Sequence, residues 1–211
     1  MATKRINGFH LEKMLRNGLA NLQRREKELN RLNVFPVADG DTGTNMCLTL
    51  GNGIRVAGSR AEVGAYLKAL SDGMLLGARG NSGVILSQFF KGLFLELSRC
   101  SSINPAELRN GLIRGYRAAY ESVIQPVEGT ILTVTREGIE HIRSQIGRAT
   151  TFEMLLSMYI AEMKKSLAFT PEVLPVLKEA GVVDSGAMGF IAIVEGMLSC
   201  LYGDVTEPQA V

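Results

Sequence analysis

Two aspartates separated by a single glycine stand out in the stretch NVFPVADGDTGTNM, residues 33–46. On a turn that contains glycine, the carboxylates of Asp39 and Asp41 can point into one pocket, but their mutual repulsion opposes this arrangement. A divalent cation removes the repulsion, and all-oxygen ligands favour Mg²⁺, which also accepts water and phosphate oxygens. Asn33 offers a neutral oxygen nearby. We therefore expect these three residues to bind a metal; an Asx turn in which Asp41 caps the next helix is the alternative.

Small polar residues and glycines precede an apolar segment at four places along the chain. These four turns are Asp41–Thr44, Gly80–Gly83, Glu128–Thr130 and Asp184–Ala187. A helix that begins at such a turn leaves backbone N–H groups free and points the positive end of its dipole toward an anion. Glycine lets a phosphate approach the backbone closely. Taken singly, each turn is typical of an ordinary helix cap; if all four meet, they form a polyphosphate site.

Apolar residues recur at helical spacing along most of the chain. Leucines mark one face of a first long helix, which must end before Pro36. Asn104 is expected to cap a helix that starts at Pro105 and continues to about Val123. Further helices are predicted over residues 44–56, 84–98, 131–146, 150–167 and 190–203.

Two helix boundaries depend on specific signals. Ser59 and Glu62 have the spacing of a capping box, which predicts a helix from Ser59 to about Ala78. Pro171 is expected to start a short helix that ends near Gly181. About eight or nine helices with short links predict a single-domain all-α bundle.

The composition excludes several classes of protein. A chain of 211 residues with 46% hydrophobic and 21% charged residues suits one globular domain, and its net charge of +2 gives no reason to expect nucleic acid or an anionic membrane as a partner. No apolar run approaches the roughly 18 residues of a membrane span. Three scattered cysteines without metal-binding spacing indicate reduced thiols in a cytoplasmic protein.

Common catalytic motifs are absent from the sequence. There is no GxxxxGK[ST] loop, no GxGxxG turn after a strand and no HRD or DFG triplet. The two histidines, His10 and His141, fall in helical patterns and are expected at the surface or in the core. The polar tail, residues 204–211, resembles a linker, so the chain is expected to be a piece of a longer protein.

Four stretches in a fixed order, NVFPVADGDTGTNM, GARGNSGVILSQ, PVEGTILTV and LPVLKEAGVVDSGAMGF, resemble the DhaL family, the ATP-binding domains of dihydroxyacetone kinases. The resemblance covers residues 5–203 and is greatest to the N-terminal domain of the A subunit of bacterial fatty acid kinases. It implies an antiparallel barrel of eight helices that holds ATP or ADP at one end through two Mg²⁺ ions.

The resemblance also implies roles for individual residues. Asp39 and Asp41 would bind Mg²⁺, and no residue beyond the metal and phosphate site is implied to be catalytic. Dihydroxyacetone kinases carry a third aspartate upstream, where this chain offers Asn33 at slightly different spacing. The residues implied to lie along the nucleotide are Thr42, Gly43, Thr44, Asn45, Asn81, Ser82, Gly83, Gly129, Thr130, Asp184, Ser185 and Gly186.

Asn33 and Ser185, which replaces a proline of the dihydroxyacetone kinase pattern, both favour the fatty acid kinase branch. That branch implies a kinase that makes an acyl phosphate from a fatty acid, presented by a separate binding protein of the DegV or fatty acid kinase B type. A homodimer formed through the full-length chain is also implied. Two alternatives stay open: the ATP-binding subunit of a dihydroxyacetone (glycerone) kinase, and a non-catalytic nucleotide-binding scaffold domain.

Overall fold

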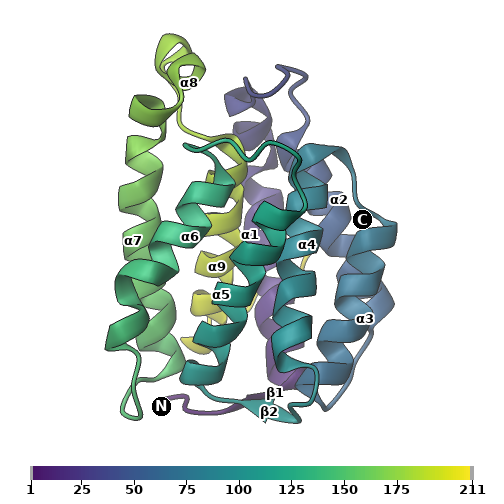
Figure 1. The fold of residues 1–211 in the computed structure, drawn as a ribbon. Helices are drawn as coiled ribbons and strands as arrows, with labels where there is room; N and C mark the ends of the chain where they lie inside the picture. Colours follow the sequence, from purple (N-terminus) through teal and green to yellow (C-terminus); the bar gives the residue numbers. More distant parts are fainter. Residues whose placement is uncertain (1, 210–211) are drawn as a thin grey trace.

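A computed structural model describes residues 2–209 and is almost entirely helical (Figure 1). The helices in these residues are α1 (Gly8–Leu32), α2 (Thr42–Ala57), α3 (Val63–Leu76), α4 (Gly80–Leu97), α5 (Pro105–Glu121), α6 (Ile131–Ile142), α7 (Phe152–Val173), α8 (Pro175–Ala180) and α9 (Ser185–Leu201). Two short strands, β1 (Ile6–Asn7) and β2 (Ser102–Ile103), pair antiparallel. The predicted all-α single-domain fold is confirmed.

Within residues 2–209, eight long helices form a closed antiparallel ring. Each packs on the next in the order α1, α2, α3, α4, α5, α6, α7, α9, and α9 returns to α1. Because consecutive helices run in opposite directions, α2, α4, α6 and α9 all begin at the same end of the barrel, which is also the end that carries α8 (Figure 1). The strands β1 and β2 lie at the opposite end.

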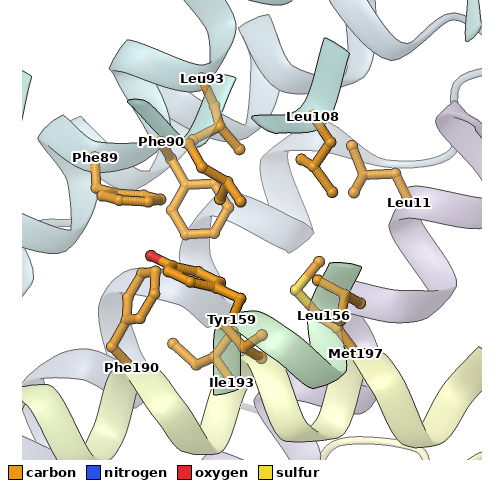
Figure 2. Close-up of a pocket in the computed structure, with 12 residues that line it drawn as sticks. Leu11, Phe89, Phe90, Leu93, Leu108, Leu156, Tyr159, Phe190, Ile193 and Met197 are labelled. Atoms are coloured by element: carbon orange, nitrogen blue, oxygen red, sulfur yellow. The ribbon is translucent and has the colours of Figure 1, made fainter. Parts of the chain in front are cut away.

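The interior of the ring is apolar. Phe89 and Phe90 of α4 are buried and face Tyr159 of α7 and Phe190 of α9 (Figure 2). The rings of Phe89 and Phe190 meet edge to face, with centroids 4.7 Å apart. A cavity of about 30 Å³ remains between these side chains, so the core is nearly filled. The phenylalanine-rich segment of α4 is therefore core.

Helices α1 and α9 pack with almost no side-chain layer between them. The Asn17 amide donates a hydrogen bond of 2.6 Å to the Gly196 carbonyl. A Cβ atom at Gly196 would lie 2.6 Å from the Asn17 carbonyl oxygen, and one at Gly18 would lie 2.8 Å from the Ile193 oxygen. Glycine at these positions therefore permits the contact that closes the ring.

The predicted capping box at Ser59 is wrong. Helix α3 begins at Val63, with Glu62 as its N-cap and no side-chain cap bond, and the Ser59 hydroxyl donates to Glu12 instead. The backbone just before β2 accepts hydrogen bonds from the start of α3 instead: the N–H groups of Val63 and Gly64 donate to the carbonyls of Ser101 and Cys100. A tertiary contact has replaced the local cap.

The predicted helix start at Pro171 is also wrong. Pro171 lies inside the last turn of α7, and the short helix α8 begins at Pro175. Proline cannot donate to the carbonyl of Leu167, but the Thr170 hydroxyl donates to that oxygen at 2.8 Å. The helix therefore continues through the proline. By contrast, Asn104 caps α5 as predicted.

The α1–α9 contact gives a test of the fold. Alanine normally stabilises a helix relative to glycine, but Gly196→Ala places a methyl group against the α1 backbone. We expect this overpacking to lower the free energy of unfolding by about 2 kcal/mol, measured by denaturant titration. Gly147→Ala is the control, because a Cβ there meets open space. Equal stability of the two variants would contradict the described packing.

Candidate functional site

Asp41 occupies the N-cap position of α2 without capping it. Within residues 2–209 its side chain makes no capping hydrogen bond, and its backbone has φ −122° and ψ 0°. Asp39 is exposed and Asp41 half-buried, and neither carboxylate belongs to an ion pair found in the described part of the chain. The alternative in which Asp41 simply caps α2 does not describe the structure, so its carboxylate can bind another group.

Asn33 holds in place the segment that joins α1 to α2, residues 33–41, here called the aspartate loop. Its side chain is 7% exposed, and its amide nitrogen donates to the Val37 carbonyl at 2.8 Å and to Asp39 Oδ1 at 3.0 Å. Its amide oxygen accepts a hydrogen bond of 2.6 Å from the Thr42 hydroxyl. Asn33 thus connects the loop to the first turn of α2, and its oxygen already has one hydrogen-bond donor.

The start of α4 adjoins the start of α2. Gly80 has φ +58°, and the Asn45 amide lies so close to it that a Cβ would collide with the amide nitrogen. The backbone N–H of Arg79 donates to the Thr49 hydroxyl of α2 at 3.3 Å. Arg79 is the N-cap of α4 and makes no side-chain cap bond within the described residues. The first-turn N–H groups of α4 are therefore available to an anion.

Asp184 caps α9 and reaches α6 as well. Its carboxylate accepts a hydrogen bond of 2.8 Å from the Ala187 N–H. Burial raises the pKa of Asp184 to about 6, while backbone N–H donors at Ala187 and Ile131, the first residue of α6, lower it. The Ser185 hydroxyl donates to the Leu29 carbonyl of α1 at 2.7 Å. This turn therefore fastens the beginnings of α6 and α9 to the end of α1.

The turn before α6 is fixed by its own hydrogen bonds. Gly129 has φ +80° and its N–H donates to the Thr133 hydroxyl at 2.8 Å. The Thr130 hydroxyl accepts from the Leu132 N–H, the cap bond of α6, and donates to Val127. A Cβ at Gly129 would lie 3.0 Å from the side chain of Leu174, so this turn packs on the end of α7.

The four turns therefore lie at the same end of the barrel, but they are not equivalent. Helices α6 and α9 carry side-chain caps from Thr130 and Asp184. Among the residues that the structure describes, the N-cap residues of α2 and α4, Asp41 and Arg79, make no side-chain cap bond. These two helix starts touch each other through Asn45 and Gly80.

A groove of about 430 Å³ opens at the same end. It runs between the last turns of α1 and the segment that leads into α9, and Leu32, Val182, Val183 and Met188 are among its lining residues. Glu28 and Lys178 also line it. The groove provides space directly beside the Asp184–Ser185 turn.

Residues 2–209 contain no group of three or more His, Cys, Asp or Glu side chains placed to hold one metal ion. Two carboxylates, Asp39 and Asp41, would supply all the protein's charge to a cation there. Such a donor set suits Mg²⁺, which often takes one or two carboxylates and completes its shell with water and phosphate. It does not suit a cation that needs a full protein cage.

Comparison with known proteins assigns the chain to a family. The model of the DAK2 domain matches residues 36–199. The chain belongs to the DAK2 domain family. Helix α1 and its C-cap residue Asn33 precede the matched range, although α1 closes the ring of this DAK2 domain.

Relatives of this DAK2 domain are considerably longer. Protein YloV of Bacillus subtilis is 41% identical over 213 residues, which cover 100% of this chain and 38% of YloV. An uncharacterized protein of Staphylococcus haemolyticus is 41% identical over 207 residues, 97% of this chain and 38% of that protein. The chain thus spans 38% of the length of these curated relatives.

Solved structures share the fold of the DAK2 domain at low sequence identity. The dihydroxyacetone kinase from C. freundii in complex with AMP-PNP and Mg²⁺ superposes with a TM-score of 0.64 at 17% identity, covering 90% of this chain and 33% of that one. The native form of that kinase superposes with a TM-score of 0.61 at 13% identity, covering 95% of this chain and 36% of that one.

None of the helices in residues 2–209 is long and apolar enough to cross a membrane.

Glu26 and Asn30 were not predicted from the sequence, and both lie beside the aspartate loop of the DAK2 domain. The Thr44 hydroxyl donates to Glu26 Oε1 at 2.7 Å, and the Asn30 amide donates to that hydroxyl at 3.0 Å. Thr44 therefore faces α1 rather than the end of the barrel. The available signal was spacing: residues 26 and 30 share one face of α1, and residue 33 follows at helical spacing just after its end.

The buried carboxyl of Asp184 makes the stability of the DAK2 domain depend on pH. Its pKa, raised from 3.8 to about 6, means that the folded state binds the proton more tightly than the unfolded chain. Ionisation as the pH rises therefore weakens the folded state. Relative to Asp184→Asn, which does not titrate, the wild type should lose about 2 kcal/mol of unfolding free energy between about pH 4.5 and about pH 7.5. A difference that is constant across this range in urea titrations would contradict the assignment.

Proposed function

We propose that the protein is the nucleotide-binding phosphotransfer domain of a Mg²⁺-dependent kinase. The observation that carries the proposal is the free carboxylate of Asp41 at the start of α2, whose first turn touches the uncapped start of α4. Carboxylates for a hard cation thus adjoin backbone donors for phosphate. The fold shared with a kinase crystallised with AMP-PNP and Mg²⁺ is consistent with this proposal.

Each part of the site then has a task in phosphoryl transfer. When bound, Mg²⁺ neutralises charge on the β- and γ-phosphate oxygens. Asp39 and Asp41 would hold it, while the N–H groups and side chains of Asn81 and Ser82 would bind the phosphates. Gly83, whose N–H donates to the Arg79 carbonyl, would lie beside them. The capped turns at Gly129–Thr130 and Asp184–Gly186 form walls beside the nucleotide. We propose ATP or ADP as the nucleotide and two Mg²⁺ ions.

A carboxylate is the acceptor that best fits these residues. It is ionised at neutral pH and needs no general base. Both histidines lie at the far end: His10 is in the first turn of α1 and His141 is in the last turn of α6. The site also offers positioning and electrostatics, which are the main demands of phosphoryl transfer. We therefore propose a fatty acid kinase that makes an acyl phosphate.

Further parts of this proposal concern the longer protein. The fatty acid would be presented by a separate carrier of the DegV or fatty acid kinase B type, and the full-length chain would form the homodimer. Such a kinase would work in the cytoplasm, where ATP is available. Neither nucleic acid nor a membrane is needed as a partner in this scheme.

Two competing functions can be separated from this one by experiment. The fold match to dihydroxyacetone kinase favours a dihydroxyacetone kinase subunit as the second candidate. ATP consumption should be at least about tenfold faster with fatty acid and its carrier than with dihydroxyacetone, a discrimination of about 1.4 kcal/mol. The reverse preference would support the second candidate. Binding of ATP at millimolar Mg²⁺ without its consumption in the presence of either acceptor would support a non-catalytic nucleotide-binding scaffold domain.

The metal assignment gives the most direct mutational prediction. Asp39→Ala and Asp41→Ala should each abolish Mg²⁺-dependent nucleotide binding, because each removes half of the protein's charge at the site. Calorimetry with and without Mg²⁺ measures this effect. Asp204→Ala, in the exposed segment after α9, is the control and should bind as the wild type does. Unchanged affinity in the two site variants would refute the metal assignment.

A further inference from the structure

Two aspartates occupy the N-cap position of a helix at this end of the barrel, and they behave differently. Asp184 accepts a hydrogen bond from the N–H of the third residue of α9, Ala187, at 2.8 Å. This is the ordinary bond of an N-cap side chain. Asp41 makes no such bond to the third residue of α2, Thr44, within the described residues. Something else must satisfy that N–H group.

The partner of the Thr44 N–H comes from another helix. Asn30 Oδ1 of α1 accepts this hydrogen bond at 3.2 Å, and the Asn30 nitrogen donates to the Thr44 hydroxyl at 3.0 Å. Asn30 therefore does for α2 what Asp184 does for α9, but from outside the helix. The close approach that this requires is visible at Gly43, where a Cβ would lie 2.5 Å from the Glu26 carbonyl oxygen.

The backbone conformation of Asp41 explains why its side chain does not cap α2. The residues whose side chains cap α5, α6, α7 and α9 all have extended ψ values, 172°, −176°, 167° and 119°. Asp41 has ψ 0°. An N-cap side chain normally reaches the first turn from an extended backbone. The conformation of Asp41 therefore directs its carboxylate away from the first turn of α2. Asp41 can adopt this conformation because Asn30 of α1 accepts the hydrogen bond of the Thr44 N–H in its place.

We propose that Asn30 is a positioning residue for the metal site: by capping α2 in place of Asp41, it keeps the Asp41 carboxylate free to bind the cation. Glu26 supports the arrangement by accepting a hydrogen bond of 2.7 Å from the Thr44 hydroxyl. Asn33, the C-cap residue of α1, fixes Asp39 by donating a hydrogen bond to its Oδ1 atom. The proposal rests on the function proposed above, because it assumes that Asp41 binds Mg²⁺.

Replacing Asn30 tests the proposal. In Asn30→Ala the Thr44 N–H loses its acceptor, and capping by Asp41 then competes with metal binding. The affinity for Mg²⁺, titrated by calorimetry in the presence of a non-hydrolysable ATP analogue, should fall at least about tenfold, the usual effect of removing a group that orients a ligand. A purely structural role would lower the melting temperature without changing Mg²⁺ affinity in the folded protein.

Asn21→Ala is the matched control. Asn21 lies on the same helix and donates a hydrogen bond of 2.7 Å to the Ala192 carbonyl of α9, away from the aspartate loop. This variant should bind Mg²⁺ within about twofold of the wild type, since it removes a similar interhelical bond without touching α2. An equal loss in both variants, or unchanged affinity in Asn30→Ala, would overturn the proposal.

Hydrogen exchange of the Thr44 amide in the wild type gives a second measurement, which holds even if Asn30→Ala does not fold. Because Asn30 and not Asp41 protects this amide, its protection should be the same with and without Mg²⁺. Loss of protection on Mg²⁺ binding would contradict the proposal. If the wild type binds the ATP analogue with the same affinity with and without Mg²⁺, the proposed function fails instead.

Discussion

Closure of the ring by α1 and α9 is the constraint on which the rest of the structure depends. A closed ring of antiparallel helices must start every second helix at the same end, so distant segments of the chain are brought to one place. The contact is close because Gly18 and Gly196 have no Cβ. It also lets Ser185 hydrogen-bond to Leu29, which fixes the first turn of α9 beside the end of α1.

The sequence was a good guide wherever a local signal had no tertiary competitor. The Asn104–Pro105 start of α5 was predicted correctly, because its capping box is complete within four residues. Ser59 carried an equivalent signal and failed, since the backbone near Ser101 satisfies the first N–H groups of α3. Pro171 failed for a related reason: a neighbouring hydroxyl occupies the carbonyl that the proline leaves without a donor.

The candidate site shows the same limit at the level of single side chains. Residue type and spacing predicted four turns and an aspartate pair, and the topology of the barrel brings the turns together. They could not predict that Thr44 faces α1, or that Thr130 and Asp184 cap their own helices while Asp41 does not. Whether an aspartate caps or stays free depends on whether a neighbouring helix offers another acceptor. That information lies in the packing of α1 on α2.

Anomalous diffraction from crystals grown with Mn²⁺ and a non-hydrolysable ATP analogue would test the central claim most directly. We expect a manganese peak within bonding distance of Asp39 and Asp41, with the phosphates of the analogue against the first turn of α4. A peak that lacks both carboxylates, or a nucleotide bound away from the starts of α2 and α4, would contradict it.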